Sequence, residues 1–246
     1  MAEFDPSNIF ALFRPVVLPG QPQLSMHRCL PALAQPDGTI QTGKRLLLHT
    51  KSPAETARRN VRFLESAFSE LTKAHDGGRR EKIIIPVSTY SLVGNEPTSL
   101  IVSAFRKVNP EIRKSIIVDL FDFSDPLSLS LLEDSLIPLF PFIEIFAAEP
   151  KRDIEDFTVF ANCNLFAVSI DFDDEEPKPE QEKQLMKFWA SATKSRLKLF
   201  VQGITSEGVR EAAKRYEATG LDGPLIGADL KSLSQTDDDK GPPPES

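Results

Sequence analysis

Several residue types that build chemical sites are scarce in this chain of 246 residues, which holds 2 cysteines, 3 histidines and 1 tryptophan. No spacing of cysteine and histidine resembles a zinc site. Cys29 and Cys163 both lie in apolar surroundings, which favours two buried free thiols in a reducing cytosol over a disulfide or a metal pair. No uncharged apolar run reaches about 18 residues, so we expect no membrane-spanning helix. No G-x-G-x-x-G or Walker-type phosphate loop is present.

Basic residues are outnumbered as well, with 29 lysines and arginines against 36 aspartates and glutamates and a net charge of -7. This balance argues against a broad surface for a nucleic-acid polymer. It leaves room for a small anionic ligand, because the local field matters more than the total charge. The first residues, MAEFDPSN, lack the basic-then-apolar profile of a secretion signal, so we expect a cytoplasmic protein.

From about residue 82, short apolar runs alternate with amphipathic segments. Apolar strands separated by helices predict a parallel sheet that is covered on both faces. The chain length suits one domain of this kind, and we predict an α/β fold, a TIM-like (β/α)8 barrel, with its site at the carboxyl ends of the strands. The expected strands are 83–88, 115–121, 142–146, 165–171, 197–203 and 221–226.

A hairpin-like opening precedes this alternation. We expect a short helix near residues 8–13, then strands at 13–20, 23–33 and 44–50, with a turn at Pro36 to Thr39. Ser52 and Pro53 predict a capped helix start. Residues 1–12 are therefore interpreted as a lead-in and 13–231 as the barrel. Residues 232–246 are acidic and proline-rich, which predicts a disordered tail.

Four segments in the first half of the barrel match a known series of motifs. FRPVV resembles Y-Q-P-I-V, with Arg14 at the glutamine, and HRCLP resembles a stretch reading E-A-L, with Arg28 at the glutamate. IIIPVS resembles L-x-V-N-L-S, with Pro86 at the asparagine and Ser88 kept. VDLFD resembles L-E-I-T-E, with Asp119 and Asp122 at the two glutamates.

Four later segments continue the series in the same order. FIEIFAAEP resembles a strand ending in D-D-F-G, but Phe146 and Ala147 stand at the two aspartates. AVSID resembles the strand carrying K-I-D, with Ser169 at the lysine and Asp171 kept. LFVQGITSEGV resembles A-E-G-V-E, with Gln202 at the first glutamate, and GLDGPLIG resembles G-x-D-x-x-Q-G-Y. Together these segments resemble the EAL domain, the barrel that hydrolyses the bacterial second messenger cyclic di-GMP.

This resemblance implies a fold and, at the same time, the loss of the family's activity. The family reaction uses two divalent ions, held by carboxylates and the asparagine, to activate water against a phosphodiester. Asp119 alone keeps a charged ligand at the matching metal positions, and Arg28 places a cation where a metal should sit. Ser169 also removes the lysine expected near the nucleophilic water. We therefore expect no catalytic residues, no metal and no cofactor.

The remaining charged residues have competing interpretations. Arg14 and Arg28 could hold phosphates or a guanine edge, or Arg28 could simply pair with Asp119 across the barrel mouth. Asp119 and Asp122 are interpreted as strand-end caps instead of metal relics. The acidic run from Asp171 to Glu176 is interpreted as a solvated loop instead of a calcium site. The candidate ligand-binding residues at the barrel mouth are Arg14, Arg28, Ser88, Asp119, Ser169 and Gln202.

We expect a catalytically inactive EAL-like domain that acts as a regulatory module by binding a protein partner in bacterial signalling. The first alternative is a receptor that binds cyclic di-GMP without cutting it. The second is an active phosphodiesterase, or another hydrolase that uses relocated carboxylates such as Glu144 or Glu149. Many EAL domains pair through helices near the active-site face, so a homodimer is also compatible with the resemblance.

Overall fold

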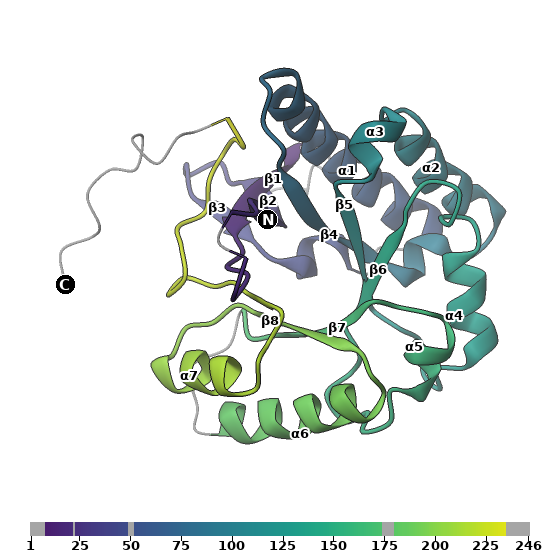
Figure 1. The fold of residues 1–246 in the computed structure, drawn as a ribbon. Helices are drawn as coiled ribbons and strands as arrows, with labels where there is room; N and C mark the ends of the chain where they lie inside the picture. The colour runs from purple at the N-terminus through teal and green to yellow at the C-terminus, as the bar shows by residue number, and fades with distance from the viewer. Residues whose placement is uncertain (1–7, 22, 49–51, 174–179, 235–246) are drawn as a thin grey trace.

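Nine strands form one curved sheet in the computed structural model, which describes residues 8–21, 23–48, 52–173 and 180–234 (Figure 1). The sheet order is β1-β2-β4-β5-β6-β7-β8-β9, and β3 pairs with β2. The strands are β1 (Ile9–Pro15), β2 (Met26–Ala34), β3 (Ile40–Thr42), β4 (Lys82–Ser88), β5 (Ile116–Phe121), β6 (Ile145–Ala148), β7 (Ala167–Asp171), β8 (Lys198–Gln202) and β9 (Gly220–Leu221).

Helices cover the outside of this sheet (Figure 1). They are α1 (Pro53–Asp76), α2 (Asn95–Arg106), α3 (Pro110–Arg113), α4 (Leu129–Leu136), α5 (Thr158–Asn162), α6 (Glu180–Lys194) and α7 (Glu207–Arg215), with 3-10 turns η2 (Lys44–Leu47) and η3 (Thr89–Leu92). The predicted start of α1 is confirmed, because the Ser52 side chain accepts a hydrogen bond from the Glu55 N–H at 3.2 Å and Pro53 follows it.

The sheet curls into a TIM-like barrel that is closed only in part. Neighbouring strands from β2 to β9 along the main path are parallel, whereas β1 runs antiparallel to β2. Two isolated bridges, Val17–Leu221 and Phe13–Leu230, join the first and last segments in place of a full ladder. The predicted α/β barrel is thereby confirmed.

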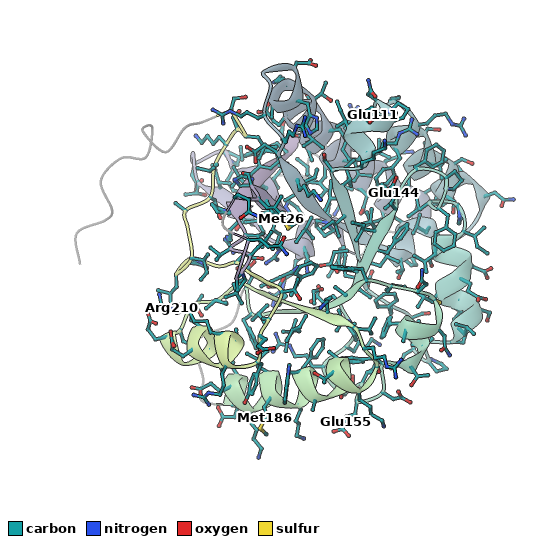
Figure 2. The ribbon with its side chains drawn as sticks, in the orientation of Figure 1. Met26, Glu111, Glu144, Glu155, Met186 and Arg210 are labelled. Carbon is teal, nitrogen blue, oxygen red and sulfur yellow. The ribbon has the colours of Figure 1, made fainter. Side chains whose placement is uncertain are left out.

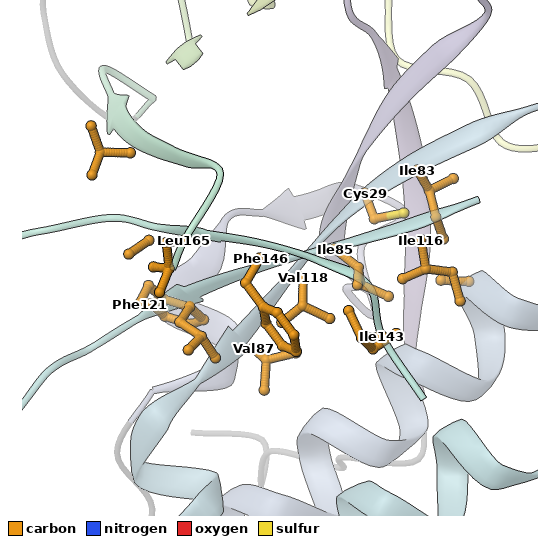
Figure 3. Close-up of a cluster of buried hydrophobic side chains, with 14 of the residues drawn as sticks. Cys29, Ile83, Ile85, Val87, Ile116, Val118, Phe121, Ile143, Phe146 and Leu165 are labelled. Carbon is orange, nitrogen blue, oxygen red and sulfur yellow. The ribbon is translucent and has the colours of Figure 1, made fainter. Parts of the chain in front are cut away.

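Alternation along the strands divides the core into two layers. On β4, Ile83, Ile85 and Val87 belong to the large cluster between the sheet and the helices, part of which is drawn in Figure 3. Ile84 points the other way and packs with Ile117 and other residues in a second cluster. Successive side chains of a strand point to opposite faces, so this second cluster fills the inside of the barrel.

The hairpin-like opening differs from the prediction in two places. The expected helix at 8–13 is wrong, because β1 begins at Ile9 and pairs in register with β2. The barrel therefore starts within the predicted lead-in. The expected strand at 44–50 is also wrong, because Gly43, at φ 116°, turns the chain into the short η2, whose Leu46 and Leu47 are buried. Residues 49 and 50 lie outside the described residues.

Two later boundaries also move. Strand β6 begins at Ile145, three residues after the predicted start, because the Phe142 and Ile143 N–H groups donate to Leu139 O in a preceding turn. Helix α7 ends at Arg215, so Gly220 begins β9 instead of closing the helix.

The segment after β9 returns along the barrel. Leu233 is buried, and its carbonyl accepts a hydrogen bond from Arg79 Nη1 at 2.8 Å, so the chain is packed at the predicted start of the tail. Residues 235–246 lie outside the described residues, and the disordered tail stays a prediction. No helix in the described ranges combines the length and apolar character needed to cross a bilayer.

Candidate functional site at the barrel mouth

On several strands an inward-facing apolar residue is followed, two positions later, by an inward-facing polar residue. The inside of the barrel is therefore apolar in its lower part and polar at the carboxyl ends of the strands. Side chains separated by two positions share a strand face. The pairs are Met26 and Arg28 on β2, Ile117 and Asp119 on β5, Ala167 and Ser169 on β7, and Phe200 and Gln202 on β8, with the first member of each in the inner apolar cluster. We define the mouth as the polar group Arg14, Arg28, Lys44, Asp119, Glu149, Ser169, Asp171, Asp173, Gln202 and Asp222.

Arg28 is the most enclosed cation of the mouth, with 1% of its side chain exposed. Its Nη2 lies 2.5 Å from Asp171 Oδ2, and its Nη1 lies 3.0 Å from both Asp222 Oδ1 and Asp173 Oδ2. The expected pairing of Arg28 with Asp119 is wrong. Asp171 and Asp173 belong to the run interpreted as a solvated loop, and that interpretation is wrong for these two residues; 174–176 lie outside the described residues.

Arg14 stands directly opposite Arg28 in the β1–β2 ladder. Two like charges in that position repel each other. Asp173 lies between them and relieves this repulsion, with Oδ1 2.6 Å from Arg14 Nη1 and Oδ2 3.0 Å from Arg28 Nη1. The other edge of Arg14 donates to Asp229 through Nε at 2.6 Å and Nη2 at 3.0 Å. Both predicted arginines therefore lie at the mouth, each held by carboxylates of this chain.

Lys44 is a residue of the mouth that sequence reasoning missed. It extends from η2 into the mouth, where its Nζ lies 3.1 Å from Asp171 Oδ2, 3.1 Å from Gln202 Oε1 and 4.0 Å from Asp119 Oδ2. It also forms an ion pair with Glu149, the residue after β6. No motif marked Lys44, and it stood in a segment wrongly predicted to be a strand.

Asp119 is held by neutral donors. Ser169 Oγ lies 2.9 Å from both of its carboxylate oxygens, and Gln202 Nε2 donates to Oδ2 at 3.0 Å. The carboxylate lies inside the barrel within β5, so its interpretation as a strand-end cap is wrong. The structure thus brings Asp119, Ser169 and Gln202 together, and their role in binding a ligand stays a prediction. The Ser88 hydroxyl donates elsewhere, to Asp122 Oδ2 at 3.0 Å.

Burial and ion pairing pull the pKa values of the mouth in different directions. Burial alone would raise the pKa of Asp171, but Arg28 and Lys44 outweigh it and hold that pKa far below its ordinary value. For Asp222 burial prevails over Arg28 and raises the pKa to about 6. Burial opposes the charge of Lys44, yet Glu149 and Asp171 raise its pKa. Asp171 and Lys44 are therefore both charged near neutral pH.

The two relocated carboxylates lie at opposite ends of β6. Glu144 is exposed and precedes the strand, so it lies at the end away from the mouth (Figure 2). Glu149 follows the strand and is paired with Lys44. With the side chains arranged in this way, no group of three or more histidine, cysteine, aspartate and glutamate side chains within the described ranges is placed to hold a metal ion.

Comparisons with known proteins give a fold but no sequence relative. No protein-family model and no curated protein matches the chain. Among solved structures, it is similar to the Bacillus subtilis YkuI protein, which has an EAL domain and is in complex with substrate c-di-GMP and calcium. The TM-score is 0.69 at 14% identity, over 94% of this chain and 59% of that chain.

Two further structures match over nearly their whole length. The FimX EAL domain from Pseudomonas aeruginosa, bound to c-di-GMP, has a TM-score of 0.64 at 16% identity, over 92% of this chain and 93% of that chain. The PaMucR phosphodiesterase, in a c-di-GMP complex, has a TM-score of 0.70 at 15% identity, over 91% of this chain and 92% of that chain. The barrel described here therefore has the fold of EAL domains.

Proposed function

We propose that this chain is a non-hydrolysing EAL-fold domain that acts in bacterial signalling by binding a protein partner. One observation carries the first half of this proposal: the carboxylates of the mouth are already paired with cations of the chain itself. Asp171, Asp173 and Asp222 contact Arg28, and Glu149 and Asp171 contact Lys44.

The mouth does not fit the two divalent ions that the fold family implies. Hard cations take several oxygen ligands at short distance. Asp119, Asp171 and Asp173 have both carboxylate oxygens engaged by groups of the chain, and Glu149 and Asp222 have one each. The apolar Ala147 takes the place of a ligand opposite Asp119 in the β5–β6 ladder. A divalent ion added beside two fixed cations would meet repulsion instead of an open shell. We therefore derive no hydrolytic step for this chain.

A groove on the mouth side of the barrel supports the second half of the proposal. It runs between η3 and α4 and has a volume of about 560 Å³. Val93 and Leu131 on its walls are 55% and 46% exposed. Asp134 adds negative charge, and Asp125 is paired with Lys151, which also lines the groove, at 3.2 Å. Exposed apolar side chains gathered around a groove are typical of protein contact sites.

A non-hydrolysing receptor for cyclic di-GMP is the second candidate. It is supported by the similarity in fold to EAL structures that are described as complexes with this nucleotide. Against it stand Arg14 and Arg28, the two guanidinium groups suited to phosphate, because both are already bound to aspartates.

Two measurements on the purified chain separate these functions. Incubation with cyclic di-GMP and manganese or magnesium is expected to give no linear dinucleotide, and calorimetric titration with the nucleotide is expected to give no heat of binding. Measurable linear product would refute the proposal. Micromolar binding without turnover would replace partner binding by the receptor function.

The partner surface is tested with paired variants. Val93→Asp/Leu131→Asp places charges in the groove, and Met186→Asp changes an exposed apolar residue on α6, at 44% exposure, as the matched control. Quantitative affinity capture is expected to recover a partner with the original chain and with the control, but not with the groove variant. Equal recovery by all three would remove the groove from the proposal.

A further inference from the structure

A cavity opens at the end of the barrel opposite the mouth. Its volume is about 500 Å³, a size typical of pockets that hold small molecules. The residues that begin β2, β4, β6 and β8 all line it, so it is the amino-end opening of the barrel. Its floor consists of members of the inner apolar cluster, among them Ile117, Phe200 and Met26, which is labelled in Figure 2.

Two lysines stand at the rim of this opening and face inward. Lys82 precedes Ile84 by two positions and Lys198 precedes Phe200 by two, and both apolar residues belong to the inner cluster. Residues separated by two positions share a strand face, so the lysines lie on the same face as that cluster. Neither ammonium forms an ion pair or a hydrogen bond with another of the described residues. Both charges are therefore available to a ligand.

The charges around the cavity favour an anion over a cation. A third lysine of the lining, Lys214, lies in the last turn of α7 and is paired with Glu211 at 2.8 Å. Among the described lining residues, Glu217 is the one carboxylate. The balance of charge at the opening is thus positive, although the chain as a whole is acidic.

The apolar part of the lining favours a hydrocarbon chain over a peptide. Phe166 and Leu24 extend the floor towards solvent, at 42% and 37% exposure, and the ring centroid of Phe166 lies 6.4 Å from that of Phe200. The strand starts around the cavity already pair with one another. A peptide backbone laid on this floor would therefore lose water from its N–H and C=O groups without gaining partners. A hydrocarbon chain has no such groups, and each methylene removed from water favours binding.

We propose that this amino-end cavity binds a fatty acid, with the acyl chain on the apolar floor and the carboxylate paired with Lys82 and Lys198. Charge-assisted hydrogen bonds from the two ammonium groups would fix the carboxylate at the rim. The site goes beyond the proposed function, because it lies at the other end of the barrel from the mouth and the groove and takes a ligand of different chemistry.

The ligand class is tested by calorimetric titration of the full chain with dodecanoate below its micelle concentration. We expect saturable binding of one dodecanoate. Octanoate should bind at least about tenfold more weakly, because its shorter chain removes less apolar surface from water. Dodecanol and the dodecyltrimethylammonium cation should also bind at least about tenfold more weakly, because neither can pair with an ammonium group.

Paired variants test the position of the site. Lys82→Met/Lys198→Met removes both charges but keeps the apolar stems, and should weaken dodecanoate binding at least about tenfold. Lys183→Met/Lys187→Met is the matched control, because it changes two exposed lysines of α6 outside the cavity lining, and it should bind as the unchanged chain does. Leu24→Asp places a negative charge at the rim without altering a strand, and should also abolish binding.

Three results would overturn the proposal. They are the absence of saturable dodecanoate binding, equally strong binding of dodecanol, and binding that persists in Lys82→Met/Lys198→Met or in Leu24→Asp. Circular dichroism identifies the folded variants, and if the double lysine variant does not fold, Leu24→Asp decides the position of the site. The proposed function is tested separately, by turnover and partner capture at the opposite end of the barrel.

Discussion

Replacing Arg28 by methionine is expected to destabilise the barrel strongly. Arg28 compensates Asp171, Asp173 and Asp222, and its removal leaves those carboxylates without their shared cation. Removing one partner of a buried ion pair costs about 3–5 kcal/mol. For a chain of this length, that loss corresponds to a fall in Tm of about 10 °C.

Arg58→Met is the matched control, because Arg58 and Glu96 form an ion pair whose side chains are 62% and 66% exposed. Such a surface pair contributes about 0–1 kcal/mol. Urea unfolding followed by circular dichroism at pH 7 would measure both variants. The penalty for Arg28→Met should shrink at pH 5, where Asp222 can take up a proton and reduce the uncompensated charge. Equal losses in the two variants would show that the Arg28 network does not stabilise the fold.

Three further predictions concern the mouth and the core. The Asp222 carboxyl should titrate near pH 6 when it is followed by carbon NMR. Because its folded pKa lies above its ordinary 3.8, its contribution to stability should fall by about 3 kcal/mol as the pH rises from about 4 to 6. A titration midpoint near 4 would contradict this. Gly203→Ala should cost at least about 2 kcal/mol more than Gly38→Ala in urea unfolding. Both glycines have positive φ, but a Cβ on Gly203 would lie 2.1 Å from a backbone nitrogen whereas one on Gly38 meets nothing, so equal losses would be inconsistent with the clash. In a Cys163→Ser variant, Cys29 should stay unreactive to a disulfide reagent at pH 8 until denaturant is added, because burial raises its thiol pKa; rapid labelling of the folded chain would refute its enclosure.

The architecture could be predicted from the sequence because its signals are local. Apolar runs such as 83–88 mark strands, and capping serines such as Ser52 mark helix starts, without reference to the rest of the chain. The Ser52 cap forms in the structure. Short elements were harder to predict. The start of β1 depends on its partner β2. Leu46 to Leu48 form an apolar run that suggests a strand, but the segment follows Gly43, which turns the chain.

The candidate site was predicted in composition but not in its connections. The resemblance placed Arg28, Asp119 and Asp171 at the mouth, and strand alternation carries all three side chains inward. Which carboxylate an arginine reaches depends on the barrel's closure and on loop paths, which no local pattern encodes. For the same reason Lys44 was missed: it reaches the mouth from outside the strands, through a connection that has no periodicity.

The seam between the ends of the chain has a mechanical consequence. β1 meets the last segment through one isolated bridge, Phe13–Leu230, and Arg14 connects Asp229 on that segment to Asp173, which also contacts Arg28. A force on the C-terminal segment that overcame the contacts of Leu233 and Leu230 would therefore pass through Arg14 and Asp173 to the centre of the barrel. A partner bound to the C-terminal segment would therefore be coupled mechanically to the interior of the barrel.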